Sequence, residues 1–337
     1  MDNDMNHQRT IGVIGAGAWG TALAQMLASD GRDVAIWAFE PDVVETINTA
    51  HRNPQYLPSA TLAPTIRATG NLDDLAGIQT VLVVTPAQVL GKVLGGLTQA
   101  PRDLVLCSKG IEAGTERLMN DVARDAAQGS QIAVLSGPTF AHEVAAGLPT
   151  AVTLACEGGT EQWDRLSPAI ARPAFRPYYS DDVTGAEIGG SIKNVLAIAC
   201  GVVDGLELGQ NARAALIARG YAEMLRFGGE LGARAETLAG LCGLGDLVLT
   251  CSSTSSRNFS LGKALGEGKN ATELMADRTT VAEGAHTAPV LAQLASKRGI
   301  AMPIVDAVNT ILSGANPRDV VAGLLARPLK AEQTDAQ

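Results

Sequence analysis

The 337-residue sequence has few aromatic side chains and no excess of positive charge. It holds 5 Phe, 3 Trp and 4 Tyr, and its formal net charge at pH 7 is −9. A protein that binds nucleic acid or an anionic membrane needs a cationic surface, and one that stacks single-stranded bases needs aromatic platforms. The composition therefore argues against a nucleic-acid partner and against attachment to an anionic membrane.

Cysteine and histidine are too few and too scattered to indicate a disulfide framework or a metal site. The 5 cysteines include no C-x-x-C pair, and the 4 histidines include no i, i+4 pair and none close in sequence to a cysteine. An odd, dispersed set of cysteines is typical of a reducing compartment. We therefore expect a cytoplasmic protein without a bound metal, although ligands assembled only by the fold would escape this search.

Long apolar runs are also missing. The longest mostly apolar stretch, Val195 to Val203, is about half the length of a membrane span. Residues 1–10 are polar and include acids, which is unlike a signal peptide. We expect no stable membrane insertion. With 46% hydrophobic and 18% charged residues, the chain has the balance of a globular protein, and its length predicts two domains.

The first half alternates short apolar runs with helix-length segments. The runs are rich in Val, Ile and Leu and end in Gly, Pro or small polar residues, which is typical of buried strands. Strands that are apolar on both faces and separated by helices indicate a parallel sheet covered on both sides. The predicted strands are residues 11–14, 34–37, 81–85, 104–108 and 132–136, with 151–156 and 175–179 as candidate extensions of the sheet.

Helical spacing replaces this alternation after about Asp181. The stretches 184–203, 212–227 and 288–298 show it over several turns, with few β-branched runs. We therefore predict an α/β protein with a Rossmann-type, doubly wound parallel sheet followed by an all-helical C-terminal domain. The expected division is a dinucleotide-binding domain at residues 1–181, a helical substrate-binding domain at 182–330 and a frayed tail at 331–337.

A glycine-rich turn follows the first predicted strand. Gly15, Gly17 and Gly20 form G-x-G-x-x-G, and a helical segment and a second strand come after it. In this context the glycines permit the turn, the close approach of a pyrophosphate and tight helix packing, while the helix N-terminus supplies N–H donors. The sequence therefore predicts a dinucleotide site, and the alternative is an ordinary turn in an unrelated α/β sheet.

An acidic residue follows the second predicted strand. Glu40 lies 20 positions beyond Gly20, where a carboxylate accepts hydrogen bonds from the adenosine ribose and repels a 2′-phosphate. No arginine follows within the next several residues. This pattern favours NAD(H) over NADP(H), unless the Glu40 carboxylate faces solvent.

Lys193 is the candidate proton carrier. A nicotinamide enzyme that reduces a ketone must protonate the oxygen left by hydride transfer. Lys193 lies in a predicted helix among small and apolar residues, with no acid between Ile188 and Val203. It follows Gly189 and Gly190, which are unfavourable in a helix interior and suggest that something approaches the backbone. A desolvated lysine near a second cation exchanges protons near neutral pH; the alternative is a structural lysine that reaches solvent.

Further polar residues fall at the same predicted sheet edge. Lys109 follows one strand and the segment 136–141 (SGPTFA) follows another. Ligands of open α/β sheets gather outside the carboxyl ends of the strands. Each segment alone is an ordinary loop, but their coincidence indicates a site, in which Lys109 is the candidate second cation.

The helical half contains a candidate anion site. The hydroxyl-rich run 252–256 leads into Arg257 and Asn258, and a guanidinium beside hydroxyl and amide donors suits a phosphate. A capped helix start is an alternative interpretation of equal weight. Asp246 lies among apolar neighbours, so it is either a helix cap or the partner of a lysine or a substrate hydroxyl.

At these positions the sequence resembles the bacterial type of NAD(P)-dependent glycerol-3-phosphate dehydrogenase. The matching pieces occur in the family's order and span about residues 10–325: GAGAWGT at 15–21, SKG at 108–110, SGPTF at 136–140, GSIKNV at 190–195, GLGDL at 243–247, SRN at 256–258 and VAEG at 281–284. The resemblance implies a 6-phosphogluconate dehydrogenase-like fold and a homodimer. It also implies reversible NAD(P)H-dependent reduction of dihydroxyacetone phosphate to sn-glycerol 3-phosphate, a precursor of glycerophospholipids.

The resemblance further implies a role for each matching residue, with Lys193 as the general acid/base. The implied substrate-binding residues are Lys109, Gly137, Thr139, Lys193, Asp246, Ser256, Arg257 and Asn258. The implied cofactor-binding residues are Gly15, Gly17, Ala18, Trp19, Gly20, Phe39, Lys109, Ala141, Arg257, Val281 and Glu283. Many relatives carry a basic residue where Phe39 stands, so this departure disfavours tight NADP(H) binding. Ala282, often Val in relatives, is a change without expected consequence.

Other functions compete with this interpretation. A related β-hydroxyacid or 6-phosphogluconate type dehydrogenase shares a glycine-lysine-asparagine helix and a helical second domain. A nucleotide-sensing protein without chemistry is a different class, and Lys193 and Lys109 argue against it because a sensor needs no buried proton carrier. A serine hydrolase is disfavoured because Ser191 lacks the full G-x-S-x-G turn.

Overall fold

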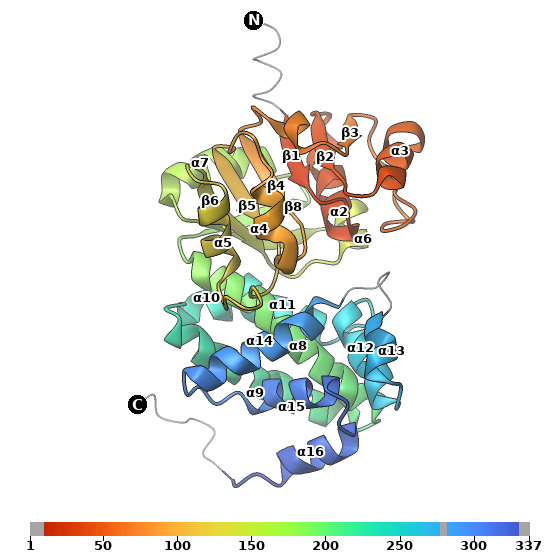
Figure 1. Cartoon of the computed structure of the whole chain (residues 1–337), viewed down its shortest axis with the longest axis vertical. Coiled ribbons are helices and arrows are strands. Elements are labelled where there is room, and N and C mark those ends of the chain that lie inside the picture. The colour runs from red at the N-terminus through yellow and green to blue at the C-terminus, as the bar shows by residue number, and fades with distance from the viewer. Residues whose placement is uncertain (1–9, 277–281, 330–337) are drawn as a thin grey trace, which may run out of the picture.

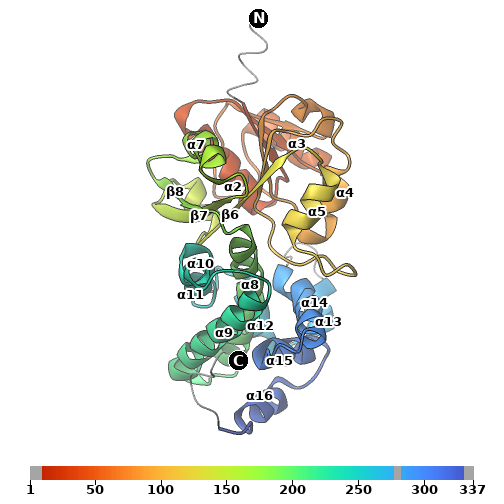
Figure 2. The same cartoon turned by 90° about the vertical axis from the view of Figure 1, so that its left-hand side faces the viewer.

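The computed structural model describes residues 10–276 and 282–329. These residues form an α/β domain, which carries the N-terminus, and a helical domain, which lies below it in Figure 1. The long helix α8 (Val183–Gly205) starts at the junction of the two domains and passes through the helical one (Figures 1 and 2). The predicted frayed tail lies outside the described residues.

The α/β domain is built on one eight-stranded sheet with the order β3-β2-β1-β4-β5-β6-β7-β8. The strands are β1 (Ile11–Ile14), β2 (Val34–Trp37), β3 (Ile66–Thr69), β4 (Thr80–Val83), β5 (Asp103–Leu106), β6 (Gln131–Ser136), β7 (Thr150–Cys156) and β8 (Phe175–Ser180). The strand order reverses between β1 and β4, which is the topological switch point of a doubly wound Rossmann-type sheet. The predicted fold class is therefore confirmed.

Two details of the sheet differ from the prediction. β3 is missing from the predicted strands because only Ile66 and Ala68 of its four residues are buried, while Arg67 is exposed. β7 runs antiparallel to β6, so the predicted parallel sheet is wrong at this pairing; the other neighbouring strands described here pair in parallel. An apolar run does not encode strand direction. Both candidate extensions join the sheet, as β7 and β8.

Helices cover both faces of this sheet. Successive residues of a strand point to opposite faces: Val13 packs into a cluster with α2, α3 and α7, and Ile14 packs into a second cluster with α4 and α5. The helices of this domain are α2 (Ala18–Leu27), α3 (Pro41–Ala50), α4 (Leu90–Leu94), α5 (Met119–Ala126), α6 (Ala141–Ala145) and α7 (Gly159–Ile170), with short turns η1 (Ala28–Asp30), η2 (Leu72–Leu75) and η3 (Ala87–Val89).

The helical domain packs around α8. Its other elements are α9 (Gly209–Glu230), α10 (Ala235–Ala239), the π-helical turn η4 (Leu241–Gly245), α11 (Asp246–Thr250), α12 (Arg257–Gly266), α13 (Ala271–Ala276), α14 (Glu283–Lys297), α15 (Pro303–Leu312) and α16 (Pro317–Leu325). By length and composition α8 is the one candidate membrane span among the described residues, but its apolar window is entirely buried inside the protein. α8 is therefore the core helix of this domain, and it extends beyond the apolar run seen in the sequence.

α8 and α12 cross with their backbones in contact. A Cβ on Gly201 of α8 would lie 2.0 Å from the Phe259 carbonyl oxygen, and a Cβ on Gly262 of α12 would lie 2.0 Å from the Ile198 carbonyl oxygen. Only glycine permits such an approach. The crossing fixes the start of α12 beside the middle of α8.

α8 also contacts the α/β domain through two polar side chains. Glu187, which is buried, accepts a hydrogen bond from the Asn120 N–H at the start of α5 at 2.8 Å. Burial raises the pKa of Glu187 to about 8, and its Oε2 has no hydrogen-bond partner among the described residues. Ser191, one turn further on, accepts a hydrogen bond from the Gly110 N–H at 2.9 Å and so holds the segment that carries Lys109.

Candidate active site

Lys193, Asp246 and Lys109 form a buried ionic cluster at the junction of the domains. Lys193 lies in the middle of α8, Asp246 is the first residue of α11, and Lys109 follows β5. One oxygen of the Asp246 carboxylate accepts a hydrogen bond from Lys193 Nζ at 2.5 Å, and the other accepts one from Lys109 Nζ at 2.8 Å. Lys193 is only 5% exposed and Asp246 is fully buried, so the fold shields their contact from water.

Burial and mutual charge set the protonation of this cluster. Burial lowers the pKa of Lys193 to about 8, against the attraction of Asp246, and the positive charge of Lys109 acts in the same direction as burial. Burial also lowers the pKa of Lys109, but Asp246 outweighs it, so this pKa is raised. Burial raises the pKa of Asp246, but the two lysines outweigh it and the pKa falls below its usual value. Lys193 is therefore the member of the cluster whose pKa lies nearest to neutral pH.

Two glycines in α8 let the rest of the cluster approach the helix. A Cβ on Gly189 would lie 2.3 Å from the Cys242 carbonyl oxygen, so glycine is needed for η4, which precedes Asp246, to pack against α8. A Cβ on Gly190 would lie 3.4 Å from Lys109 Cγ. The expectation that other groups approach the backbone at these glycines is confirmed.

Thr250 is a member of the cluster that the sequence analysis does not single out. Its hydroxyl oxygen accepts a hydrogen bond from Lys193 Nζ at 2.9 Å and donates one to Asp246 Oδ1 at 3.2 Å. Thr250 lies four residues after Asp246 in α11, so the two side chains share one face of the helix. This spacing is the signal by which Thr250 can be found from sequence. The Asp246 carboxylate and the Thr250 hydroxyl together fix the position of the Lys193 ammonium.

The start of α12 gathers the residues of the predicted anion site. Ser256 is the N-cap of α12, and its hydroxyl accepts a hydrogen bond from a backbone N–H of the first turn, so the capped helix start is real. Asn258 donates to Asn194 Oδ1 at 3.1 Å and accepts from the Gly284 N–H at 2.9 Å. The Arg257 side chain is exposed. An arginine at a helix N-terminus, beside the neighbour of Lys193, is suited to an anion.

The segment after β6 lies against the helical domain. Gly137 packs closely on β7, where a Cβ would lie 2.9 Å from a backbone Cα. The Thr139 hydroxyl donates to the Gly137 carbonyl at 3.3 Å. Pro138 Cγ lies 3.8 Å from the Cβ position of Gly245, the residue before Asp246. Ala141 begins α6, which packs against α2. The segment after β6 therefore extends from α2, the helix that follows the glycine turn, to the ionic cluster.

The glycine turn has the geometry that a dinucleotide requires. Gly15 has a φ of 109°, and a Cβ on Gly20 would lie 1.8 Å from the Gly15 carbonyl oxygen. Gly17 is the N-cap of α2, and Ala18 and Trp19 follow it in half-buried positions. The N–H groups of this first helical turn lack intrahelical acceptors and attract a pyrophosphate. These residues fit the phosphates of NAD(P).

Glu40 and Phe39 lie just beyond β2. The Glu40 carboxylate is half-buried and accepts a hydrogen bond from the Tyr56 hydroxyl at 2.8 Å. The carboxylate is therefore held by the protein and does not simply face solvent. Phe39 is 81% exposed, which leaves its ring free to lie against a bound ligand.

Glu283 joins the site from the start of α14. Burial raises the pKa of its carboxyl group, while the positive charges of Arg257, Lys109 and Lys193 act in the opposite direction. Glu283 is therefore within electrostatic reach of both the anion site and the ionic cluster. Val281, the remaining cofactor-binding candidate, lies outside the described residues.

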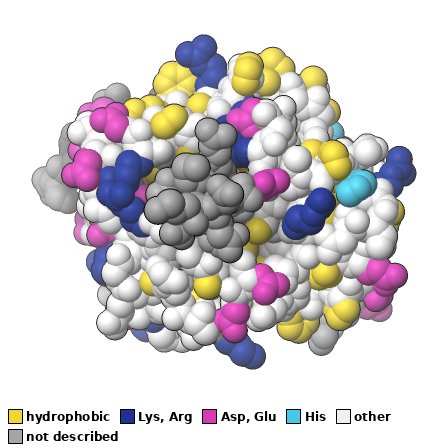
Figure 3. Space-filling view, turned by 90° about the horizontal axis from the view of Figure 1, so that it is seen from above, with side chains coloured by type: hydrophobic (Ala, Val, Ile, Leu, Met, Phe, Trp, Pro, Cys, Tyr) yellow, Lys and Arg dark blue, Asp and Glu magenta, His cyan; other side chains and the backbone are white. Residues whose placement is uncertain are grey.

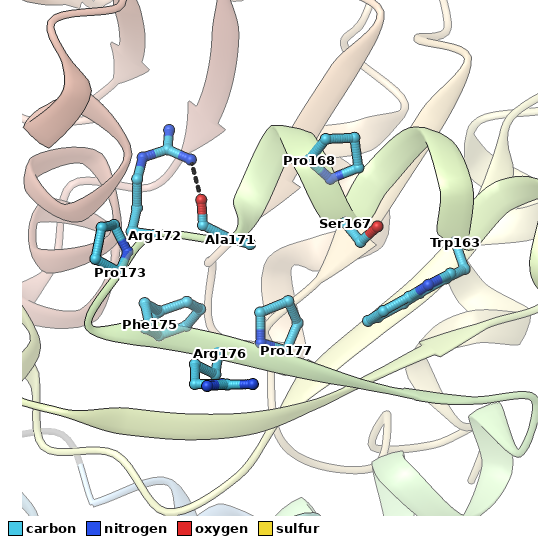
Figure 4. Close-up of a pocket in the computed structure, with 9 residues that line it drawn as sticks. All are labelled: Trp163, Ser167, Pro168, Ala171, Arg172, Pro173, Phe175, Arg176 and Pro177. Atoms are coloured by element: carbon cyan, nitrogen blue, oxygen red, sulfur yellow. Dashed lines mark hydrogen bonds between the residues drawn. The ribbon is translucent and has the colours of Figure 1, made fainter.

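A separate hollow lies between α7 and β8, at the edge of the sheet (Figure 4). Its walls include Trp163, Pro168, Arg172, Phe175, Arg176 and Pro177. None of the residues predicted to bind cofactor or substrate lines it. Within residues 10–276 and 282–329, no group of three or more His, Cys, Asp or Glu side chains is placed to hold a metal ion.

The fold and the site together define a class of enzyme. A glycine turn that opens the first helix of a doubly wound sheet, facing a helical domain with a water-shielded lysine, is the arrangement of a nicotinamide-nucleotide-dependent dehydrogenase. The chain belongs to the NAD-dependent glycerol-3-phosphate dehydrogenase family, because the profiles for the N-terminal and C-terminal parts of that family match residues 10–161 and 182–322.

Individual relatives agree with this assignment. Proteins named glycerol-3-phosphate dehydrogenase (NAD(P)+) from Erythrobacter litoralis and Novosphingobium aromaticivorans are each 74% identical to this chain; the matches cover 97% and 96% of it and 99% and 98% of the relatives. The crystal structure of glycerol-3-phosphate dehydrogenase from Coxiella burnetii has a TM-score of 0.90 at 40% identity, covering 95% of this chain and all of that one. The protein is an NAD(P)-dependent oxidoreductase of this family.

Proposed function

We propose that the protein catalyses the reversible, NAD(P)H-dependent reduction of dihydroxyacetone phosphate to sn-glycerol 3-phosphate. The family profiles and the names of its 74% identical relatives support this reaction. The observation that carries the proposal is the buried Lys193 ammonium, bonded to Asp246 and Thr250 at the junction of the domains. Lys109, which follows β5, shares the Asp246 carboxylate with this group, and Asn258 in the first turn of α12 contacts the neighbouring Asn194.

Lys193 is the general acid in the direction of reduction. The bound cofactor supplies the hydride that adds to the carbonyl carbon of the substrate. As the C=O double bond becomes a single bond, the Lys193 ammonium gives its proton to the oxygen and becomes a neutral amine. In the reverse direction the neutral amine takes the proton of the substrate hydroxyl as the hydride leaves the carbon.

Asp246 and Lys109 support this proton transfer. The Asp246 carboxylate stabilises the charged form of Lys193 and fixes its orientation, while Lys109 lowers the pKa of Lys193. Lys109 lies between the substrate and the nicotinamide side of the site, where its positive charge stabilises negative charge on the reacting oxygen. An Asp246 carboxylate shared by two lysines leaves the cluster with a net positive charge, which suits an anionic substrate.

The substrate phosphate binds at the start of α12. Arg257 supplies a guanidinium, and Ser256 and Asn258 place polar groups beside it at the helix N-terminus. Gly137 and Thr139 line the opposite side, on the segment that follows β6.

The cofactor binds along the glycine turn, with a preference for NAD(H). Gly15, Gly17 and Gly20 hold the pyrophosphate, and Ala18, Trp19, Phe39, Ala141, Val281 and Glu283 complete the contacts. Glu40 stands where the ribose hydroxyls bind and is held there by Tyr56; its charge disfavours a 2′-phosphate. Phe39 supplies no positive charge to offset this effect.

We further propose that the enzyme is a cytoplasmic homodimer that feeds glycerophospholipid synthesis. The five cysteines are free and buried, which suits a reducing compartment. At the end of the α/β domain, described basic and acidic side chains are interspersed (Figure 3), as expected for a protein with a small-molecule substrate and no nucleic-acid partner. Light scattering measures the dimer directly, and a mass equal to one chain contradicts it.

A spectrophotometric assay tests the reaction. Loss of the reduced-nicotinamide absorbance is followed with NADH and with NADPH, each against dihydroxyacetone phosphate and against a 3-oxo acid. We expect turnover with dihydroxyacetone phosphate and a higher kcat/KM for NADH. Turnover with the 3-oxo acid alone favours a β-hydroxyacid type dehydrogenase, and nucleotide binding without turnover on any ketone favours a sensor.

A further inference from the structure

Asn53 is a fully buried carboxamide that contacts the glycine turn from inside the domain. Its Nδ2 donates one hydrogen bond to the Ala16 carbonyl oxygen and another to the Thr21 hydroxyl, each at 2.8 Å. The Thr21 hydroxyl donates in turn to the Ala16 carbonyl at 3.1 Å. The Ala16 carbonyl therefore accepts two side-chain hydrogen bonds, from residues that lie 5 and 37 positions after it in sequence.

This anchoring fixes the direction of the next N–H group. The Ala16 carbonyl and the Gly17 N–H belong to the same peptide unit, and the described peptide bonds are trans. In a planar trans peptide the C=O and N–H bonds point in opposite directions. Because the Ala16 carbonyl is held toward the interior, the Gly17 N–H points away from it, and it has no acceptor among the described residues. It joins the free N–H groups at the start of α2.

Asn53 is itself held rigidly. Its side-chain oxygen accepts a hydrogen bond from the Tyr56 N–H at 3.3 Å, and its carbonyl accepts one from the Leu57 N–H at 2.9 Å. Leu57 is buried in the core on the α2 side of the sheet. The Tyr56 hydroxyl reaches Glu40, so the same turn supports the glycine loop at one point and the ribose end of the site at another.

We propose that Asn53, together with Thr21, is a positioning residue for cofactor binding: the two side chains clamp the Ala16–Gly17 peptide so that the glycine turn presents its N–H groups to the cofactor pyrophosphate. Asn53 is fully buried and acts only through the backbone. The inference rests on the binding of a dinucleotide at this turn, to which it adds the groups that hold the turn in its binding conformation.

Three variants test the clamp. Asn53→Asp keeps the shape but replaces the donating amide with an acceptor. Thr21→Val removes the hydroxyl, and Thr21→Ser keeps it. We expect Asn53→Asp and Thr21→Val to raise the Kd for NADH about tenfold, because each variant removes a hydrogen bond that orients an N–H donor for the anionic pyrophosphate. Thr21→Ser is expected to bind NADH like the unmodified protein. Isothermal titration measures these constants without turnover.

Two competing ligands distinguish positioning from general damage. ADP-ribose carries the pyrophosphate and adenosine does not, so the inhibition constant of ADP-ribose should rise about tenfold in the clamp variants while that of adenosine stays unchanged. At saturating NADH, kcat and the KM for the ketone should also stay near their original values. A parallel loss for both ligands overturns the proposal, because it points to a distorted domain.

Asn48, which is exposed, provides a control carboxamide in the preceding helix, α3. Its carboxamide donates to the Ala68 carbonyl at 2.8 Å and accepts from the Ala68 N–H at 2.9 Å, but it contacts β3 and not the glycine turn. Asn48→Asp should lower the unfolding temperature and leave the Kd for NADH unchanged.

The outcomes separate this inference from the proposed reaction. If the unmodified protein binds NADH but reduces no ketone, the reaction fails and the clamp is still measurable. If folded Asn53→Asp and Thr21→Val both bind NADH and ADP-ribose normally, the clamp is wrong. Should Asn53→Asp fail to fold, Thr21→Val against Thr21→Ser decides the question.

Discussion

Lys193 Nζ lies 2.5 Å from Asp246 Oδ1, although the two residues are 53 positions apart in the chain. The contact joins the core helix of the second domain to the first residue of α11. Burial of this pair brings the pKa of Lys193 to about 8. The Asp246 contact therefore fixes where the ammonium points, while burial and the charge of Lys109 lower its pKa against the attraction of Asp246. The orientation and the pKa are open to separate tests.

The pH dependence of the two reaction directions should be opposite. With Lys193 as the proposed general acid, reduction needs its ammonium form, which is present below its pKa of about 8 and is lost as the pH rises through that value. Oxidation needs the neutral amine, which forms over the same range. We expect kcat/KM for reduction to fall about tenfold per pH unit above the pKa, and kcat/KM for oxidation to rise toward a plateau. Initial rates in both directions measure this.

Thr250 provides the control for this profile. Its hydroxyl accepts a hydrogen bond from the Lys193 ammonium and so stabilises the charged form. Thr250→Val should shift the pH profiles of reduction and oxidation to lower pH, and Thr250→Ser should restore both profiles. Profiles that are flat through this range would show that Lys193 is not the proton donor.

Removal of Lys193 should abolish turnover and spare the cofactor site. Lys193→Ala eliminates the general acid, so we expect kcat to fall by about 100-fold to 10,000-fold. The glycine turn lies in the other domain, so the Kd for NADH should stay near its original value. Calorimetry and steady-state kinetics measure the two constants. An equal loss of both, with a lower unfolding temperature, would assign Lys193 a folding role.

Arg257 should act far more on the phosphorylated ketone than on the nucleotide. Arg257→Ala removes a charged hydrogen-bond donor from the start of α12, and we expect the KM for dihydroxyacetone phosphate to rise by about 10-fold to 100-fold. The KM for NADH should change far less. Lys263→Ala is the control, because Lys263 lies on the same helix but pairs with Asp204. If Arg257→Ala leaves the ketone KM unchanged, Arg257 has no part in phosphate recognition.

Glu187 should make the protein less stable as the pH rises. Its pKa is raised from 4.5 to about 8 in the folded state, so the folded protein binds one more proton than the unfolded chain between these values. The stabilisation is complete at low pH and is lost as the pH rises through the folded pKa, by at most about 1.4 kcal/mol per pH unit. Glu187→Gln should flatten this slope between pH 5 and 8 in urea unfolding experiments. An unchanged slope would contradict the buried, protonated carboxyl group.

The glycine contacts between α8 and α12 should be essential for stability. Gly201→Ala puts a Cβ 2.0 Å from the Phe259 carbonyl oxygen, and relief of that overlap requires the helices to separate, so we expect a loss of about 1 to 3 kcal/mol or more. Gly229→Ala in α9 is the control, because its Cβ meets nothing within 4 Å and alanine is the better helix former by about 1 kcal/mol. Chemical denaturation should show that Gly201→Ala lowers the free energy of unfolding and that Gly229→Ala raises it. Equal effects would exclude backbone contact at the crossing.

The fold class was readable from the sequence because the strand and helix periods are strong. β1 and β4 are continuous apolar runs, and the helical spacing that predicts α8 continues without a break. β3 was not predicted, because an edge strand with one exposed arginine has too few buried residues to form a recognisable apolar run. The direction of β7 depends on the path of the chain between β6 and β7, and the pattern of apolar side chains does not reveal that path.

The site was predictable residue by residue but not as a set of contacts. From the sequence, Asp246 could be either a helix cap or the partner of a lysine or a substrate hydroxyl. Only the fold shows that it pairs with both lysines. Thr250 follows Asp246 at helical spacing, so the sequence could have predicted that the two side chains lie on the same helix face. Asn53 had no local signal, because its partners lie 37 and 32 positions earlier and a buried carboxamide is indistinguishable in sequence from one in an exposed turn.

Direct backbone contact between α8 and α12 has a consequence for substrate choice. No layer of side chains separates the two helices at the crossing, so we expect the separation between Lys193 and the α12 N-terminus to vary little. On the proposed function, a phosphorylated ketone one carbon longer that binds by its phosphate at α12 would carry its carbonyl group past Lys193. On that proposal, the packing of Gly201 and Gly262 would limit the length of the substrate without touching it.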